Sequence, residues 1–121
     1  MFDPTGSGKN IDLGTSGGLY SWAKSINNRG QIVGRTYDRL GISRATLFDP
    51  TGGGNNIDLN TLIDPGLGWW LVHANSINDN GWIVGRGVNP DGYERAYLLI
   101  PEPASALLMV LGVFALRQRR R

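Results

Sequence analysis

Few side chains in this sequence could perform acid–base or nucleophilic chemistry, and they do not form a recognisable set. His73 is the only histidine, and there is no cysteine. A Ser-His-Asp triad requires a histidine paired with an acid, and a zinc site requires several histidine or cysteine ligands. We therefore interpret His73 as an ordinary strand residue and predict no catalytic residue, no metal site and no cofactor. The chain is not expected to be an enzyme.

A turn rich in asparagine and aspartate, residues 78–81, contains the oxygen ligands that calcium prefers. The matching turn of an internal repeat, described below, is residues 27–30 and holds Arg29, whose charge would oppose a cation. Asparagine, aspartate and glycine also favour tight turns without any metal. We therefore interpret both segments as turns.

Two adjacent tryptophans, Trp69 and Trp70, are the candidates for contact with a ligand. They lie in an insertion around residues 64–70 that also contains proline and glycine. Flat aromatic rings in a loop can stack on sugars or on the surface of a protein partner. The alternative is that they cover the open edge of a sheet.

An internal repeat supplies the elements that would position these residues. The matching segments are 2–15 with 48–61, 23–35 with 74–86, and 44–47 with 95–98. The first pair is identical at 11 of 14 positions and the second at 9 of 13. The chain thus divides into repeat 1, residues 2–47, and repeat 2, residues 48–99. His73 of repeat 2 matches Trp22 of repeat 1, so this position is not reserved for chemistry.

Each repeat is predicted to form four short antiparallel strands. The pattern Ser-Ile-Asn-x-x-Gly-x-Ile-Val-Gly occurs in both repeats and puts an asparagine–glycine turn between two β-prone segments. Gly30 and Gly81 lie where such a turn needs positive φ. A third strand is expected at Arg-Ala-x-Leu and a fourth at Asn-Ile-Asp-Leu. The predicted fold class is all-β, with two propeller-blade-like repeats that form a partial β-propeller.

The repeat pattern resembles the extracellular HAF-repeat family over residues 2–99. The resemblance is carried by A-x-S-I-N-x-x-G-x-I-V-G, followed by R-A-x-L and F-D-P-x-G…I-D-L. The triplet that names the family is Arg-Ala-Thr at 44–46 and Arg-Ala-Tyr at 95–97, in place of His-Ala-Phe. The resemblance implies a propeller-like array outside the cell, and it implies no reaction.

Two blades are fewer than the four to eight that a typical propeller contains. The residues after Met1 have neither the basic nor the apolar region of a signal peptide. We therefore expect the chain to be a fragment whose signal peptide and further blades lie upstream. The alternative is that several chains assemble into one ring.

The C-terminal tail, residues 101–121, has three consecutive parts. The motif Pro101-Glu102-Pro103 comes first, then an apolar run at 104–116, then an arginine-rich end. The run is predicted to be one hydrophobic helix about 20 Å long, which is short for a bilayer core of about 30 Å. The predicted membrane residues are Ala104, Leu107, Leu108, Val110, Leu111, Val113, Phe114 and Leu116, and the basic cytoplasmic end is Arg117, Arg119, Arg120 and Arg121.

This tail resembles the PEP-CTERM sorting signal. The resemblance implies recognition at residues 101–103 by an exosortase-type processing enzyme in the envelope of a Gram-negative bacterium. The apolar run would be a transient anchor in the inner membrane, with the body outside the cytoplasm. Processing would then release the protein to the cell surface or the extracellular polysaccharide. The alternative is a core helix of a soluble protein, but the run has no polar face.

The distribution of charge argues against a nucleic acid partner. Of 12 basic residues four lie in the tail, and residues 1–100 hold 8 basic and 9 acidic residues. A nucleic-acid-binding domain needs lysine and arginine clustered on its folded body. We therefore exclude nucleic acid.

Together these observations predict a non-catalytic exported surface or extracellular-matrix protein that is sorted and processed through its tail. One alternative is a glycan- or protein-binding propeller module that uses Trp69 and Trp70. The other is part of a larger enzyme whose catalytic residues are absent from this chain.

Overall fold

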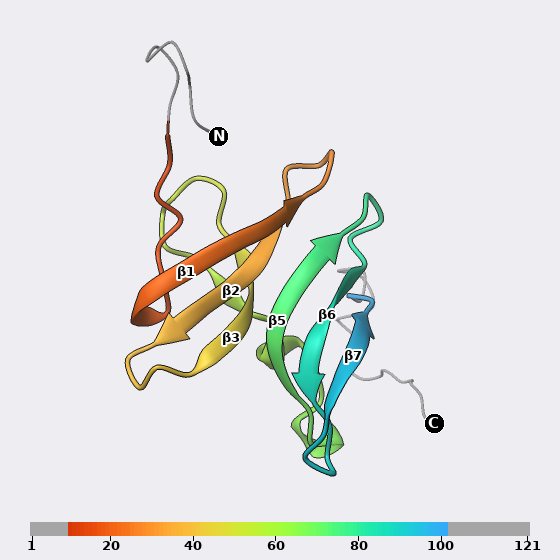
Figure 1. Cartoon of the computed structure of the whole chain (residues 1–121). Coiled ribbons are helices and arrows are strands. Elements are labelled where there is room, and N and C mark those ends of the chain that lie inside the picture. Colours follow the sequence, from red (N-terminus) through yellow and green to blue (C-terminus); the bar gives the residue numbers. More distant parts are fainter. Residues whose placement is uncertain (1–9, 102–121) are drawn as a thin grey trace.

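Two antiparallel sheets make up most of the part of the chain that the computed structural model describes, residues 10–101 (Figure 1). Sheet 1 has the strand order β1 (Gly17–Ile26), β2 (Ile32–Asp38), β3 (Ser43–Phe48) and β4 (Ile57–Asp58). Sheet 2 has the order β5 (Trp70–Ile77), β6 (Ile83–Val88) and β7 (Glu94–Leu99). Two short 3-10 helices, η1 (Leu59–Leu62) and η2 (Pro65–Leu67), connect the sheets. The mostly-β prediction is confirmed: residues 10–101 contain no helix of seven or more residues and no closed barrel.

The asparagine–glycine turns lie where the sequence predicts them. Gly30 joins β1 to β2 with φ +78°, and Gly81 joins β5 to β6 with φ +81°. In the first turn the Gly30 amide donates to the carbonyl of Asn27 at 3.1 Å, and in the second the Gly81 amide donates to Asn78 at 3.0 Å. These left-handed positions suit glycine, which has no Cβ to clash with the backbone.

Each first strand carries the same irregularity in its pairing with the next strand. The register of β1 on β2 shifts between Ala23 and Ser25, and that of β5 on β6 shifts between Ala74 and Ser76. A residue inserted in this way is a β-bulge, which bends the strand and re-aims side chains. The two repeats therefore share a bulge as well as a turn.

The sheets are out of phase with the sequence repeats. The strand β4 belongs by sequence to repeat 2, yet it pairs with β3 of repeat 1. Its register places Asp58 opposite Thr46 and Ile57 opposite Leu47. The matching residues of repeat 1, 11–12, precede β1 and belong to neither sheet, so the fourth strand predicted at this segment of repeat 1 is wrong. Sheet 1 thus takes its last strand from the following repeat.

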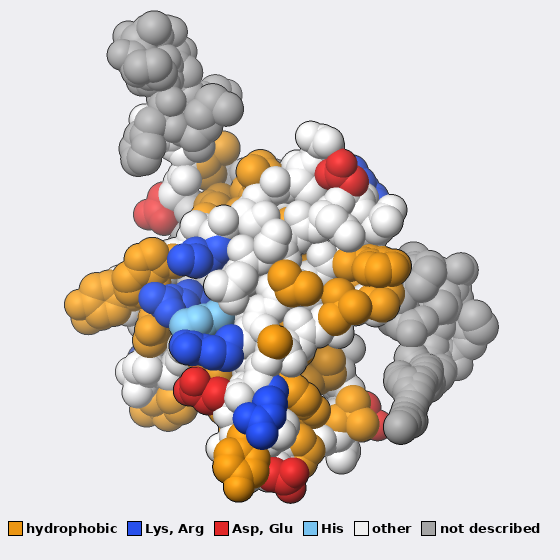
Figure 2. All heavy atoms as spheres, turned by 45° about the vertical axis from the view of Figure 1, so that its right-hand side comes forward, with side chains coloured by type: hydrophobic (Ala, Val, Ile, Leu, Met, Phe, Trp, Pro, Cys, Tyr) orange, Lys and Arg blue, Asp and Glu red, His pale blue; other side chains and the backbone are white. Residues whose placement is uncertain are grey.

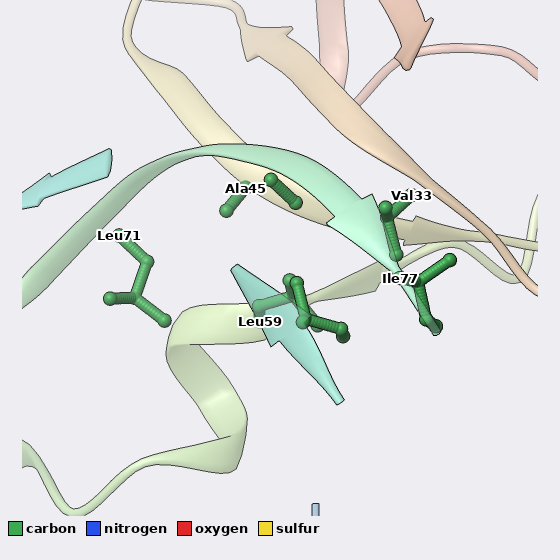
Figure 3. Packing of buried hydrophobic residues seen from close by; sticks show 7 residues of the cluster. Val33, Ala45, Leu59, Leu71 and Ile77 are labelled. Carbon is green, nitrogen blue, oxygen red and sulfur yellow. The ribbon is translucent and has the colours of Figure 1, made fainter. Parts of the chain in front are cut away.

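One hydrophobic core lies between the sheets, with β5 packed across β1, β2 and β3. Figure 3 shows Val33 and Ala45 of sheet 1 facing Leu71 and Ile77 of β5, with Leu59 of η1 among them. Burial of aliphatic side chains such as these contributes roughly 1.5–3 kcal/mol each when it is complete. Ala74 and Ile83 complete the buried cluster.

We name the sheet faces by their position relative to this core. The inner face of sheet 1 carries Val33 and Ala45, and its outer face carries Ala23, Ile26 and Ile32. The inner face of sheet 2 carries Ala74, Ile77 and Ile83, and its outer face carries Val84, Ala96 and Leu98. These faces follow from the alternation of side chains along each strand.

Most of the predicted sorting tail, residues 102–121, lies outside the described residues, and so does its apolar helix at 104–116. Pro101 is described: it follows β7 and is exposed. Within residues 10–101 no helix has the length and apolar character needed to cross a membrane.

Candidate functional site: a basic hollow between the sheets

A hollow of about 270 Å³ lies where the first two strands of sheet 1 meet those of sheet 2. It is lined by Lys24, Arg35, His73, Ala74, Asn75 and Arg86. Figure 2 shows lysine and arginine side chains gathered around the single histidine on this face. We call this feature the basic hollow.

The repeated bulges and the repeated arginine position these side chains. Lys24 and Asn75 are the inserted residues of the bulges in β1 and β5, so both point away from the regular alternation. Arg35 pairs with Trp22 across β1 and β2, and Arg86 pairs with His73 across β5 and β6. The hollow is therefore built from equivalent positions of the two repeats.

Both ring nitrogens of His73 face arginine. Arg35 Nη1 lies 2.5 Å from His73 Nε2, and Arg86 Nη2 lies 3.3 Å from His73 Nδ1. Arginine can only donate hydrogen bonds, and a neutral histidine has one acceptor nitrogen and one N–H. One of the two contacts therefore sets an N–H against another N–H, which is unfavourable.

Burial and the nearby positive charges favour the neutral form of His73. Burial of the ring lowers the pKa of His73 below its ordinary value, and the positive charges of Arg35, Arg86 and Lys24 lower it further. Glu94 acts in the opposite sense. In its neutral form the ring adds no further positive charge to a hollow that already holds three cations.

Arg35 has unused hydrogen-bonding capacity. Its Nε atom is buried and has no hydrogen-bond partner among the described residues. Its guanidinium lies 4.4 Å from the centre of the Trp22 ring, a cation–π contact that satisfies no N–H. The only carboxylate paired with a cation of the hollow, among residues 10–101, is Glu94, at 3.7 Å from Arg86 and largely exposed. A bound anion would supply the missing acceptors.

Aromatic rings border the basic hollow on sheet 1. Tyr20 stacks on Trp22 with ring centres 5.9 Å apart, and Tyr37 meets Trp22 edge-on at 5.8 Å. Tyr20 is 59% exposed and Trp22 is 43% exposed. Rings that remain this open can stack on the apolar face of a sugar.

The predicted ligand-contact residues, Trp69 and Trp70, lie in packing positions. Trp69 is half-buried and packs against the core. Trp70 Nε1 donates to the carbonyl of Ser43 at 3.2 Å, and the Arg44 guanidinium lies 5.0 Å from its ring centre. These contacts join the insertion to sheet 1, and contact with a ligand stays a prediction.

The asparagine-rich turns bind each other. The Asn28 amide donates to Asp79 Oδ1, and Asn28 Nδ2 donates to Asp79 Oδ2, both at 2.8 Å. Asn27 Nδ2 donates to the carbonyl of Asn78 at 2.8 Å. In residues 10–101 no three His, Asp or Glu side chains converge as a metal site would require. The turn residues thus hold the two sheets together at one end.

Sequence reasoning missed Lys24, Arg35 and Arg86 as partners of His73. His73 does lie on a strand, as predicted, but its contacts cross from one repeat to the other. The available signal was the arginine retained at the end of Gln-Ile-Val-Gly-Arg and Trp-Ile-Val-Gly-Arg in the two repeats.

Comparisons with protein-family models, with curated proteins and with solved structures give no match.

Proposed function

We propose that this chain is a non-catalytic exported surface or extracellular-matrix protein, sorted through its C-terminal tail by an exosortase-type enzyme. The observation that carries the proposal is the order of the tail: a Pro-Glu-Pro motif, an uncharged apolar run and an arginine-rich end. The run can be held in the inner membrane, and the arginines retain the C-terminus on the cytoplasmic side. Pro101, the first residue of the motif, follows β7 and is exposed, which is compatible with recognition by a processing enzyme.

We further propose that the two sheets are blades of a propeller-like array. The support comes from the repeated strand–turn–strand units, the four-stranded sheet 1 and the packing of one sheet face on the next. Such an array places loops and strand ends at the surface for binding, which suits an extracellular scaffold.

Processing can be tested in a Gram-negative host that has an exosortase-type enzyme, with a secretion signal added to the full chain. We expect the secreted protein to lose the mass of the tail in the normal host and to keep it in a host that lacks the enzyme. Substitution of Pro101 and Pro103 by Ala should block the mass change. The matched control is Pro50→Ala, in the exposed turn that follows β3. Loss of the tail in the enzyme-deficient host would refute the proposal.

A second candidate function is favoured by the basic hollow: binding of acidic polysaccharide. Lys24, Arg35 and Arg86 offer charge-assisted hydrogen bonds to carboxylate or sulfate groups, and the open rings of Tyr20 and Trp22 lie beside them. This site differs from the tryptophan pair 69–70 that the sequence favoured. It is compatible with an exported matrix protein, because extracellular polysaccharides often carry acidic groups.

Binding can be measured by calorimetry with a polyuronate and with neutral dextran. We expect the polyuronate to bind and the neutral dextran not to bind. Binding of the polyuronate should weaken as salt is added. Arg86→Ala should weaken it by about tenfold or more, since a hydrogen bond to a charged group contributes about 1.5–3 kcal/mol. Arg39→Ala, in the exposed turn between β2 and β3, is the matched control. Equal loss in both variants would indicate non-specific charge attraction and refute the site.

A further inference from the structure

The packing between the sheets joins unlike faces. The inner face of sheet 1 is equivalent by sequence to the outer face of sheet 2, because Val33 matches Val84 and Ala45 matches Ala96. Val33 is fully buried, whereas Val84 is 45% exposed. Ile77 of sheet 2 is 6% exposed, whereas the matching Ile26 of sheet 1 is 64% exposed. An interface of this kind is heterologous, so each partner keeps one surface able to repeat the contact.

The exposed parts of the two outer faces therefore complement each other. On the outer face of sheet 1, Thr36 and Thr46 are already buried, and Thr36 contacts Ser16 of the N-terminal segment. The outer face of sheet 2 offers the residue types that sheet 1 buries in the core, and the outer face of sheet 1 offers those that sheet 2 buries. The segment that precedes β1 also contains a residue that matches the interface between the sheets. Leu13 matches Leu59, the residue of η1 that is fully buried between the sheets, and Leu13 is only half-buried.

Sheet 2 also has an open edge. Among residues 10–101 no strand pairs with the outer edge of β7, whereas the equivalent edge of β3 pairs with β4. The β4 match in repeat 1 is Ile11–Asp12, which lies exposed and outside both sheets. An unpaired strand edge is a ready site for another extended segment.

Sheet 2 has the arginine of the corresponding ion pair at this edge but not its carboxylate partner. In sheet 1, Arg44 Nη1 binds Asp58 Oδ2 at 2.6 Å, which fastens β4 beside β3. The matching residues are Arg95 and Asp12. Arg95 has no carboxylate within ion-pair distance among the described residues; its Nη1 donates only to the carbonyl of Glu94. Asp12 is exposed at the start of the described chain.

We propose that copies of this chain associate head to tail, with sheet 1 of one copy packed on the outer face of sheet 2 of the next. Residues Ile11–Asp12 of the first copy pair with β7 of the second as a fourth strand. The register is that of β3 and β4, so Ile11 lies opposite Leu98 and Asp12 opposite Tyr97, and Asp12 forms an ion pair with Arg95. Two to four chains would supply the roughly four to eight blades of a closed ring. The proposal deepens the propeller-like arrangement proposed above and is independent of sorting. It places Arg86 of the basic hollow at the junction between copies, because Arg86 lies beside Ala96 on the outer face of sheet 2.

A charge exchange between copies tests the proposal with the full chain in mild detergent. The Arg95→Asp variant sets a second carboxylate against Asp12 at each junction, and the Asp12→Arg variant sets a second guanidinium against Arg95. Each variant alone should therefore associate at least about tenfold more weakly than the wild type. In an equimolar mixture of the two variants, opposite charges meet only at junctions between unlike chains. The double variant Asp12→Arg/Arg95→Asp is therefore the sharper rescue. It restores opposite charges at every junction, and we expect it to regain wild-type association by sedimentation and native mass spectrometry.

The matched control for this exchange is Arg39→Asp, which reverses a charge in the exposed turn between β2 and β3. It should associate as the wild type does, because residue 39 lies outside both the open edge of β7 and the segment Ile11–Asp12.

The absence of cysteine allows a second measurement of the register. Mild oxidation should join Ile11→Cys chains to Leu98→Cys chains in a mixture, and neither variant to itself. The control within one chain is Leu47→Cys with Ile57→Cys, whose residues are observed opposite each other in β3 and β4.

Three outcomes would overturn the proposal: monomers at all concentrations, wild-type association by Arg95→Asp alone, or cross-linking of Leu98→Cys to itself, which indicates a symmetric contact. Monomers that still form the control disulfide within the chain would reject assembly while leaving the packing of the two sheets intact. The tail alone cannot produce the expected result, because its attraction does not depend on the charges at residues 12 and 95.

Discussion

In sheet 1 the side of β2 that carries Val33 is covered by β5, while in sheet 2 the matching side of β6, with Val84, faces solvent. The opposite holds for Ile26 and Ile77 at the ends of the first strands. The two sheets share a turn, a bulge and a strand order, so local sequence does not explain the difference. Burial depends here on which neighbour a repeat has on each side. The same residue type should therefore have different energetic weight in the two repeats.

The largest expected difference is between the matching leucines Leu59 and Leu13. Leu59→Ala should lower the free energy of unfolding by about 2–5 kcal/mol, because it leaves a cavity in the core between the sheets. Leu13→Ala should cost about 1 kcal/mol or less in the monomer, because this side chain is only half-buried. Urea unfolding followed by tryptophan fluorescence measures both. Equal costs would mean that the two positions are equally packed, contrary to the comparison.

Substitutions at a second pair of matching residues, Gly34 and Gly85, should lower the free energy of unfolding by similar amounts in the two sheets. A Cβ at Gly34 would lie 1.9 Å from the carbonyl oxygen of Trp22, and one at Gly85 would lie 2.0 Å from that of His73. Both clashes are with the backbone of the adjacent first strand, so neither is relieved by turning a side chain. Gly34→Ala and Gly85→Ala should each cost about 1–3 kcal/mol or more by urea unfolding. A harmless Gly85→Ala would show that sheet 2 is paired more loosely than sheet 1.

The matching arginines of the third strands should differ less. Arg44 binds Asp38 at 2.9 Å and Asp58 at 2.6 Å, and all three side chains are partly buried. Arg44→Ala should cost about 1 kcal/mol in dilute, monomeric protein, whereas Arg95→Ala should cost less than about 0.5 kcal/mol. High salt should narrow the gap if the pairing of charges is its cause. A gap that salt leaves unchanged would point to packing of Arg44 on Trp70.

The smallest expected difference is in the pH dependence of the free energy of unfolding. His73 titrates and contributes to this dependence, whereas the matching Trp22 of repeat 1 does not. The pKa of His73 in the folded chain is lowered from 6.5, so between that lowered value and 6.5 the unfolded chain binds a proton that the folded chain does not. Stability should therefore fall as the pH drops below about 6.5 and level out below the folded-state pKa. His73→Gln should lack this part of the slope in unfolding measured from pH 7.5 to 5. An identical slope in the variant would assign it to carboxylates.

Much of the local structure could be predicted from the sequence. The positions of Gly30 and Gly81, the strands on either side of them and the strand at 57–58 follow from turn chemistry and strand propensity, which act over a few residues. The bulges were not predicted, because the inserted Lys24 and Asn75 are unlike each other and neither is a glycine. The short helices of the insertion were not predicted either, because they depend on capping by Asp58 and Asp64.

The candidate site was less accessible to sequence reasoning. His73 and Arg35 are 38 residues apart and meet only because β5 crosses sheet 1. Trp69 and Trp70 are candidates for ligand contact with edge covering as the alternative, and the structure gives them contacts to the core and to Ser43. The sequence of the insertion does not reveal whether these two side chains pack against another part of the same chain.

The sequence by itself determined the number of repeats, their asparagine–glycine turns and the strands on either side of those turns, since each depends on neighbouring residues. Only the tertiary structure decided which face of each repeat is buried. Each repeat has apolar residues on both faces of its sheet. A repeated sequence does not indicate whether a neighbouring sheet packs on one face or on the other. For the same physical reason, the tertiary structure alone could bring Arg35 of one repeat to His73 of the other, and could leave Val84 and Ile26 open.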